Sequence, residues 1–303
     1  MIELLLAVIL SSIPIMLAAT GELVVERSGV LNLGVEGMML MGAVFASITI
    51  ISTGDPYLSI LIGALAGALT SAIFGFFTLT LATNQVATGL ALTIFGAGLS
   101  GLIGASYIGK AIDRLPQVPL PLLSKIPILG TLLFDHNILV YLTFIIIGLV
   151  SWFLHKSKYG LILRAIGNNH DSAHALGYSV LSFRWAAVVF GGIMAGLGGS
   201  FLPLVLTPHW AEGMTAGKGW IALALVVFAS WRPLRIPVGA LLFSGITVMQ
   251  LVGQARGWTM PSQFLSMLPY LATIGVLVFI SRNREFSLIN SPACLGKIFI
   301  AGK

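Results

Sequence analysis

The stretch RAIGNNHDSAHALGYS, residues 164–179, is the longest polar run in a chain that is otherwise apolar almost from end to end. The 303 residues are 57% hydrophobic and only 9% charged, and their mean hydropathy is +1.00. Soluble domains carry roughly 25% charged residues. A globular fold cannot bury this much apolar surface, so lipid is the expected solvent on both sides of the polar run.

Apolar stretches of membrane-spanning length flank this run. Candidate spans lie near residues 3–20, 35–53, 57–82, 86–108, 137–155, 183–206, 218–231, 236–253 and 265–281. A helix needs about 20 apolar residues to cross the hydrocarbon, so the sequence predicts an all-α, polytopic membrane protein of about 8–10 transmembrane helices. Some of these helices are expected to be broken or re-entrant. Residues 1–303 are expected to form a single transmembrane domain.

The distribution of basic residues sets the expected orientation. With nine spans and a cytoplasmic C-terminus, eleven of the sixteen Lys and Arg lie inside. Cytoplasmic loops carry the excess of positive charge, so the N-terminus is expected outside a bacterial plasma (inner) membrane and the C-terminus in the cytoplasm. The loop 109–136, with four prolines, is then external and reads as an extended lid or hairpin. The polar loop 156–182 is then cytoplasmic.

Charge and cysteine usage exclude other classes of function. The net charge of +6 is spread over many loops, which indicates membrane topology and not a nucleic-acid partner. The single cysteine, Cys294, rules out an intrachain disulfide and a cysteine-based metal cluster.

Local chemistry predicts two short helical pieces within the polar loop, with a turn at residues 167–169. Asn168, Asn169 and Asp171 are natural N-cap residues for a second helix over residues 172–176. A surface helix that exposes leucine, alanine and tyrosine needs a partner. The polar run is therefore interpreted as a docking segment.

A metal site is the alternative interpretation of the same residues. His170 and His174 stand four positions apart, as in the HExxH motif of zinc proteases. Such a protease needs a glutamate as general base and a third ligand, whereas Asp171 occupies the acidic position here. An intramembrane metalloprotease would bind zinc and lose activity with a chelator. The sequence favours a partner-facing loop without a metal.

The segment YGLILRAIGNNHDSAHALGYSV, residues 159–180, resembles the cytoplasmic coupling segment of permease subunits in ABC importers of branched-chain amino acids, simple sugars and nucleosides. Residues 26–43, ERSGVLNLGVEGMMLMGA, resemble the signature of the nucleoside-type subgroup. Residues 84–100 and 217–245 are also similar to family segments, in the family's order. The resemblance implies a permease with the fold of a type II-like ABC importer.

In this family the coupling segment docks into a groove on the ATPase subunit. The residues that the resemblance assigns to this ATPase coupling are Arg164, Gly167, Asn168, Asn169, Asp171, Ala173, His174 and Gly177. His174 departs from the family pattern, which often has alanine at this position.

The resemblance also implies the partners. The chain has no Walker A loop, so ATP and Mg²⁺ are expected on a separate ATPase, and this chain is expected to bind no cofactor and to catalyse nothing. It would form half of a translocation path for nucleosides or simple sugars. A second, related permease is expected to complete a heterodimer, and an extracytoplasmic substrate-binding protein would deliver the cargo.

Polar residues that interrupt the apolar spans are candidates for the substrate path. Ionisable groups at membrane depth usually face a bundle interior or a water path, and amide side chains offer donors and acceptors to a neutral solute. The candidates are Glu26, Asn32, Glu36, Asn84, Gln85 and Thr88. An ordinary solvated loop around residues 26–36 is the other interpretation. The alternative function is an ion-coupled secondary transporter or channel that uses Glu26 and Glu36.

Small residues predict one close helix contact. Gly192-x-x-x-Gly196 within GGIMAGLGGS, residues 191–200, is typical of helices whose backbones approach each other closely in a membrane.

Overall fold

The computed structural model describes residues 2–119, 130, 132, 134–257, 264, 267–268, 271, 274–275, 278 and 290–300. Within these residues the regular structure is helical, apart from three isolated β-bridges. Seven described helices are long and apolar enough to cross a membrane. The expected all-α, polytopic membrane architecture is confirmed. The candidate span near 265–281 and residues 120–129 of the proline-rich loop lie largely or wholly outside the described residues.

The described elements follow one another along the chain. They are α1 (Ile2–Arg27), α2 (Val35–Thr53), α3 (Pro56–Gly75), the π-helical turn η1 (Phe76–Thr80), α4 (Gln85–Gly104), the 3-10 turn η2 (Ala105–Tyr107), α6 (Ile138–Lys156), α7 (Lys158–Asn168), α8 (His170–Ala175), α9 (Val180–Phe201), the π-helical turn η3 (Leu202–Leu206), α10 (Lys218–Phe228), the 3-10 turn η4 (Pro233–Arg235) and α11 (Ile236–Ala255).

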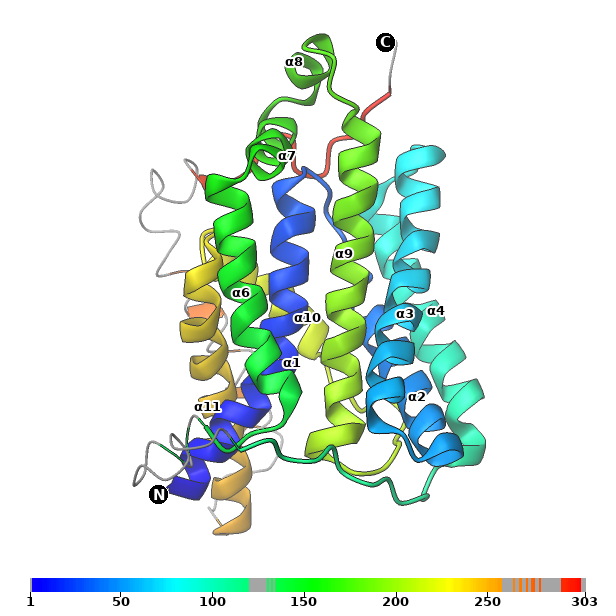
Figure 1. Cartoon of the computed structure of the whole chain (residues 1–303), viewed down its shortest axis with the longest axis vertical. Coiled ribbons are helices and arrows are strands. Elements are labelled where there is room, and N and C mark those ends of the chain that lie inside the picture. Colours follow the sequence, from blue (N-terminus) through cyan, green and yellow to red (C-terminus); the bar gives the residue numbers. More distant parts are fainter. Residues whose placement is uncertain are drawn as a thin grey trace.

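The long helices run along the long axis of the molecule, and α7 and α8 cap one end of it (Figure 1). The described C-terminal tail, residues 290–300, lies at the same end as α7 and α8. The first turn of α1 lies at the opposite end. We refer to the end with α7 and α8 as the coupling end.

Polar side chains mark where the long helices begin. Asp55 caps α3 by accepting a hydrogen bond from Tyr57 N at 2.8 Å. Asn84 caps α4 in the same way, with Ala87 N as donor at 3.0 Å. Each cap satisfies a backbone N–H that has no partner within its own helix. These local signals therefore fix the boundaries between spans.

The contact between α3 and α9 is built from small residues. A Cβ added to Gly67 would collide with Gly192 O, and one added to Gly196 would collide with Gly63 O. The two backbones approach each other so closely that only glycine fits, which is the close packing typical of membrane helices. The predicted contact at Gly192-x-x-x-Gly196 is confirmed.

The apolar stretch 218–231 does not form the expected full span. Its helix, α10, has 11 residues, which at 1.5 Å per residue gives a length of about 16 Å. This is about half of the hydrocarbon thickness of about 30 Å. The helix α10 is therefore one of the expected broken helices and not a full span. The hydropathy of a sequence identifies an apolar stretch but does not say where within the membrane its helix begins.

The described part of the proline-rich loop is extended and packs beside η3. Leu115 N donates to Leu204 O at 2.9 Å, and Ile112 N donates to Pro208 O at 3.0 Å. This described part of the loop therefore lies beside η3, at the end of the molecule opposite the coupling end.

Candidate functional site

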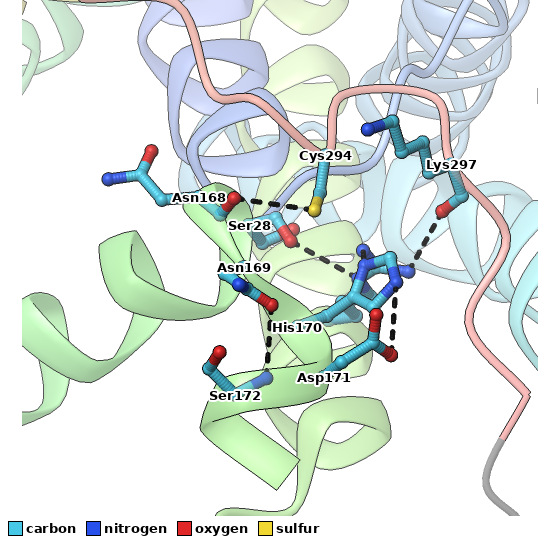
Figure 2. A network of polar contacts seen from close by, with 9 residues as sticks. Ser28, Asn168, Asn169, His170, Asp171, Ser172, Cys294 and Lys297 are labelled. Atoms are coloured by element: carbon cyan, nitrogen blue, oxygen red, sulfur yellow. Dashed lines mark hydrogen bonds and ion pairs between the residues drawn. The ribbon is translucent and has the colours of Figure 1, made fainter. Parts of the chain in front are cut away.

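The coupling segment, α7 and α8, folds as two short helices. Ser157 Oγ accepts a hydrogen bond from Gly160 N at 3.0 Å and caps α7. Asn169 leaves the helical conformation, with φ −152°, and its Oδ1 accepts from Ser172 N at 3.0 Å (Figure 2). This residue therefore ends α7 and starts α8, and the expected pair of helices is confirmed.

Two glycines let the coupling segment sit directly on the spans. A Cβ on Gly160 would collide with Phe153 O of α6. A Cβ on Gly167 would collide with Arg27 O, at the last residue of α1. Because these neighbours are backbone atoms, they cannot rotate aside. The helix α7 therefore rests directly on backbone atoms at the ends of α1 and α6.

Arg184 of α9 ties four parts of the chain together. Its side chain is 1% exposed. Nε donates to Ser28 O at 3.2 Å, Nη1 to Lys297 O at 3.2 Å, and Nη2 to His170 Nδ1 at 3.1 Å. Sequence reasoning missed this residue, although an arginine inside an apolar span is a recognisable signal of a buried polar contact.

The C-terminal tail binds along the inner face of the coupling segment (Figure 2). Cys294 N donates to Gly167 O at 2.9 Å, and Gly296 N donates to Gly29 O at 3.1 Å. The Phe299 ring contacts the His170 ring edge-to-face, with 5.3 Å between the centroids. The tail, Arg184 and the two glycines together form what we call the root of the coupling segment.

His170 serves the root as a neutral ring. Burial lowers the pKa of His170, the charge of Arg184 lowers it further, and Asp171 opposes both effects. Because Nδ1 accepts from Arg184, the proton belongs on Nε2, which lies 3.5 Å from Asp171 Oδ1. Within the described chain, no group of three His, Cys, Asp or Glu side chains is placed to hold a metal.

The tip of the coupling segment, residues 174–178, is exposed. Leu176 is 77% exposed and Tyr178 is 36% exposed. The predicted coupling residues differ in their exposure. Asn168, Asn169, Asp171, His174 and Gly177 are exposed, Arg164 is half-buried, and Gly167 and Ala173 are buried.

A second polar cluster lies inside the bundle, where the carboxylate of Glu36 receives the start of α10. Its Oε1 accepts from Thr215 Oγ1 at 2.6 Å and from Gly217 N at 2.8 Å, and its Oε2 accepts from Gly219 N at 2.6 Å. A carboxylate at a helix N-terminus is favoured by the unpaired N–H groups and by the helix dipole. Both oxygens of Glu36 are therefore occupied in holding the half-helix.

The linker between α1 and α2 is held from both sides. Glu22 Oε1 accepts from Asn32 N at 3.1 Å, and Gln85 Oε1 accepts from Leu31 N at 2.8 Å. The other polar atoms of these side chains, Glu22 Oε2 and Gln85 Nε2, are buried without a hydrogen-bond partner among the described residues. Sequence reasoning missed Glu22, although an acid four positions before Glu26 inside an apolar helix is a local signal.

The end of α1 is tied to the turn that follows α10. Glu26 Oε2 accepts from Trp231 Nε1 at 2.5 Å, and Arg27 Nη2 donates to Trp231 O at 2.8 Å. Ser230 and Trp231 both have positive φ, 51° and 54°, which is unfavourable for residues with a side chain. The contacts with α1 hold this strained turn in place.

The remaining predicted path residues lie near the linker but differ in exposure. Asn84 is exposed and serves as the cap of α4. Thr88 is half-buried, and its Oγ1 lies 2.9 Å from Thr83 Oγ1. The structure thus brings Asn32 and Gln85 together around one linker, whereas Glu36 and Glu26 hold the start of α10 and the turn after it.

The sequence has clear relatives. It is 36% identical to a putative glucose ABC transporter permease protein, TsgC13, of Haloferax volcanii, over 93% of this chain and 92% of the relative. It is 34% identical to the nucleoside ABC transporter permease protein NupC of Lactococcus lactis subsp. cremoris, over 88% of each chain. It is 30% identical to the guanosine ABC transporter permease protein NupQ of Bacillus subtilis, over 98% of this chain and 96% of that one. No solved structure matches the chain significantly.

A family model covers most of the chain. Residues 4–277 match the model described as branched-chain amino acid transport system / permease component. This range contains α1 from residue 4 onward, the other long described helices through α11, and the whole coupling segment. Together with the relatives, the match shows that the chain belongs to the family of branched-chain amino acid transport system permease components and is a membrane-embedded permease of an ABC transporter.

Proposed function

We propose that the chain forms half of the translocation path of an ATP-driven importer of nucleosides or simple sugars, with α7 and α8 coupled to a separate ATPase. The observation that supports this most directly is the contrast within the coupling segment. Its root is fixed by backbone contacts and by Arg184, whereas its tip exposes Leu176. An exposed apolar tip on a firmly held base suits a partner protein that binds the tip and displaces the segment.

The contacts of the root suggest how motion would reach the spans. Displacement of α8 acts on Arg184 and hence on α9, and displacement of Gly167 acts on the end of α1. Coupling requires that the ATPase and the cargo bias the same inward–outward equilibrium. Since α1 also carries Glu22 and Glu26, the helix that contacts the coupling segment also carries residues of the candidate path.

The linker between α1 and α2 is the proposed lining of the cargo path. Glu22 Oε2 and Gln85 Nε2 supply a buried acceptor and a buried donor without partners among the described residues. A neutral solute rich in hydroxyl groups or ring nitrogens satisfies both kinds of group. The glucose, nucleoside and guanosine permeases among the relatives support a cargo of this class.

Several partners follow from this proposal. A second permease is expected, because the chain also matches the guanosine ABC transporter permease protein NupP of Bacillus subtilis, with 23% identity over 73% of this chain. NupP and NupQ come from the same organism, which supports a heterodimer. A substrate-binding protein would dock outside the cytoplasmic membrane, at the end opposite the coupling end. The N-terminus would lie outside and the C-terminus inside.

The experiment that tests this proposal is a pair of matched truncations. Leu176→Ala removes the most exposed apolar side chain of the tip, and Leu58→Ala removes that of a leucine that is 37% exposed at the opposite end of the molecule. Burial of a leucine side chain contributes about 1.5–3 kcal/mol, so the affinity of the Leu176→Ala transporter for its ATPase should be about 10–100-fold lower than that of the wild type. Uptake should fall with it. Equal ATPase retention by the two variants would refute the assignment.

A further inference from the structure

The C-terminal tail, residues 290–300, adds a second exposed apolar surface beside the tip of the coupling segment. The tail starts on the inner face of that segment, where Cys294 N donates to Gly167 O at 2.9 Å. Its described end extends past the start of α9 and lies beside α8 (Figure 1). The residues that the family model matches stop at residue 277, so the family match implies nothing about this tail.

One aromatic side chain, Phe299, anchors the end of the tail on α8. It is 8% exposed, and its ring contacts the rings of His170 and His174 edge-to-face, with 5.3 and 5.4 Å between the centroids. It also belongs to a small buried cluster that joins α7, α8 and the start of α9, with Ile162, Ile166, Ala173 and Val180. A ring buried against three helices fixes the main chain that carries it, so the neighbours of Phe299 have a defined position next to α8.

The residues on either side of Phe299 are exposed apolar side chains. Ile298 is 41% exposed and Ile300 is 50% exposed. An alternation of exposed, buried and exposed residues is typical of an extended segment that is covered on one face. Consecutive Cα atoms are about 3.8 Å apart, so both isoleucines lie close to the contact between Phe299 and His174. Since His174 precedes Leu176 by two positions, the two isoleucines and the tip form neighbouring parts of one exposed surface.

The composition of this surface fits a protein partner. Exposed polar residues, Lys297 of the tail and Asp171 and His174 of α8, lie among the apolar side chains. Apolar contact residues within a polar rim are the usual pattern of interfaces between proteins. Exposed apolar side chains gathered on one surface indicate a partner that covers them. The ATPase is the partner that this surface fits, because a protein bound to α8 lies directly beside the tail.

We propose that the C-terminal tail is a second docking element for the ATPase, with Phe299 as its anchor and Ile298 and Ile300 as its contact residues. This inference rests on the proposed coupling of α8 to a separate ATPase, and it extends that contact to a segment outside the coupling motif. The tail and α8 share one attachment to α9, because Arg184 donates both to Lys297 O and to His170 Nδ1. The ATPase therefore contacts two elements that are held by the same side chain.

The test measures the affinity of the ATPase for the purified transporter in lipid nanodiscs. Ile300→Glu places a charge within the proposed contact. The matched control is Ile108→Glu, because Ile108 is 56% exposed and lies directly before the proline-rich loop, at the opposite end of the molecule. A carboxylate buried in an apolar contact loses its hydration, so Ile300→Glu should weaken ATPase binding at least about tenfold. Ile108→Glu should leave the affinity unchanged.

A photocrosslinking side chain at the same position separates direct contact from an indirect effect. Ile300→p-benzoyl-phenylalanine should crosslink to the ATPase in the assembled transporter, and the same substitution of Ile108 should not. Equal ATPase affinity of the two glutamate variants would overturn the proposal. Weakened binding without a crosslink to the ATPase would do the same, because it would mark a purely structural role. Crosslinks to lipid alone would identify a membrane contact and would also refute the proposal.

The outcome at Leu176 distinguishes this inference from the proposed function. If Leu176→Ala weakens ATPase binding and Ile300→Glu does not, the assignment of the tail is wrong and the coupling role of α8 stands. If neither variant weakens binding, the proposed coupling to the ATPase is itself wrong.

Discussion

The two polar interruptions of this apolar chain, residues 22–36 and residues 156–182, satisfy their polar groups in different ways. In the first, carboxylates are buried and accept from backbone N–H groups and side chains of distant segments, as Glu36 does from the start of α10. In the second, one buried arginine, Arg184, holds the root, and the tip is left exposed.

This difference indicates which parts are fixed and which await a partner. A buried charge inside the bundle is tolerated only when its hydrogen bonds are complete, so Glu36 belongs to the architecture. An exposed leucine at the end of a short helix, such as Leu176 directly after α8, gains stability only when a partner covers it. The interior cluster therefore shapes the broken helix, and the coupling segment presents a surface.

The largest effect is expected from the interior cluster. Glu36→Gln keeps the side-chain shape but replaces one carboxylate oxygen by an NH2 group, which then faces either the donors at Oε1, from Thr215 and Gly217, or the donor at Oε2, from Gly219. Loss of these charge-assisted bonds should lower the free energy of unfolding by about 4 kcal/mol and abolish uptake. Chemical unfolding in detergent measures the change. Glu212→Gln, at an exposed position, is the control; a similar loss in both variants would show that Glu36 has no special role.

The next largest effect is expected at the root. Arg184→Gln leaves Ser28 O, Lys297 O and His170 Nδ1 without their donor. We expect the free energy of unfolding to fall by about 3 kcal/mol and the C-terminal tail to detach from the coupling segment more often. Limited proteolysis of the tail reports the second effect directly. If the tail is cleaved no faster than in Arg256→Gln, the clamp assigned to Arg184 does not exist.

A smaller effect tests the contact between α7 and α1. Gly167→Ala forces a methyl group against Arg27 O, whereas Gly148→Ala adds the same methyl group where no atom lies within 4 Å. Overpacking of this kind costs about 2 kcal/mol. Uptake should therefore fall strongly in the first variant and stay unchanged in the second. Normal uptake by Gly167→Ala would show that this contact does not transmit motion.

The smallest effect is expected from pH. Burial holds the pKa of His170 in the folded protein below its unfolded value of about 6.5. The unfolded chain therefore binds more protons as the pH falls, so the contribution of this residue is present above that value and is lost on acidification. Melting temperatures at pH 7.5 and pH 5 should differ more for the wild type than for His170→Gln, whose amide oxygen still accepts from Arg184. An identical pH dependence in the two proteins would show that His170 does not contribute to the pH dependence of stability.

The sequence predicted those features of the molecule that depend on local chemistry. The two pieces of the coupling segment follow from the capping side chain of Asn169, and the α3–α9 contact follows from the spacing of Gly192 and Gly196. The half-helix α10 was not predicted, because its start is fixed by Glu36, more than 180 positions earlier in the chain. The clamp of Arg184 on Lys297 likewise joins residues 113 positions apart, which no local pattern reveals.

The most direct test of the account is the accessibility of the coupling tip. A cysteine introduced at Leu176, with the buried Cys294 replaced by alanine, gives a single label site in the chain. A membrane-impermeant maleimide should modify it in inside-out vesicles stripped of ATPase, and bound ATPase should block the reaction. Modification from the external medium, or labelling that bound ATPase leaves unchanged, would contradict the claim that this segment is the cytoplasmic coupling site.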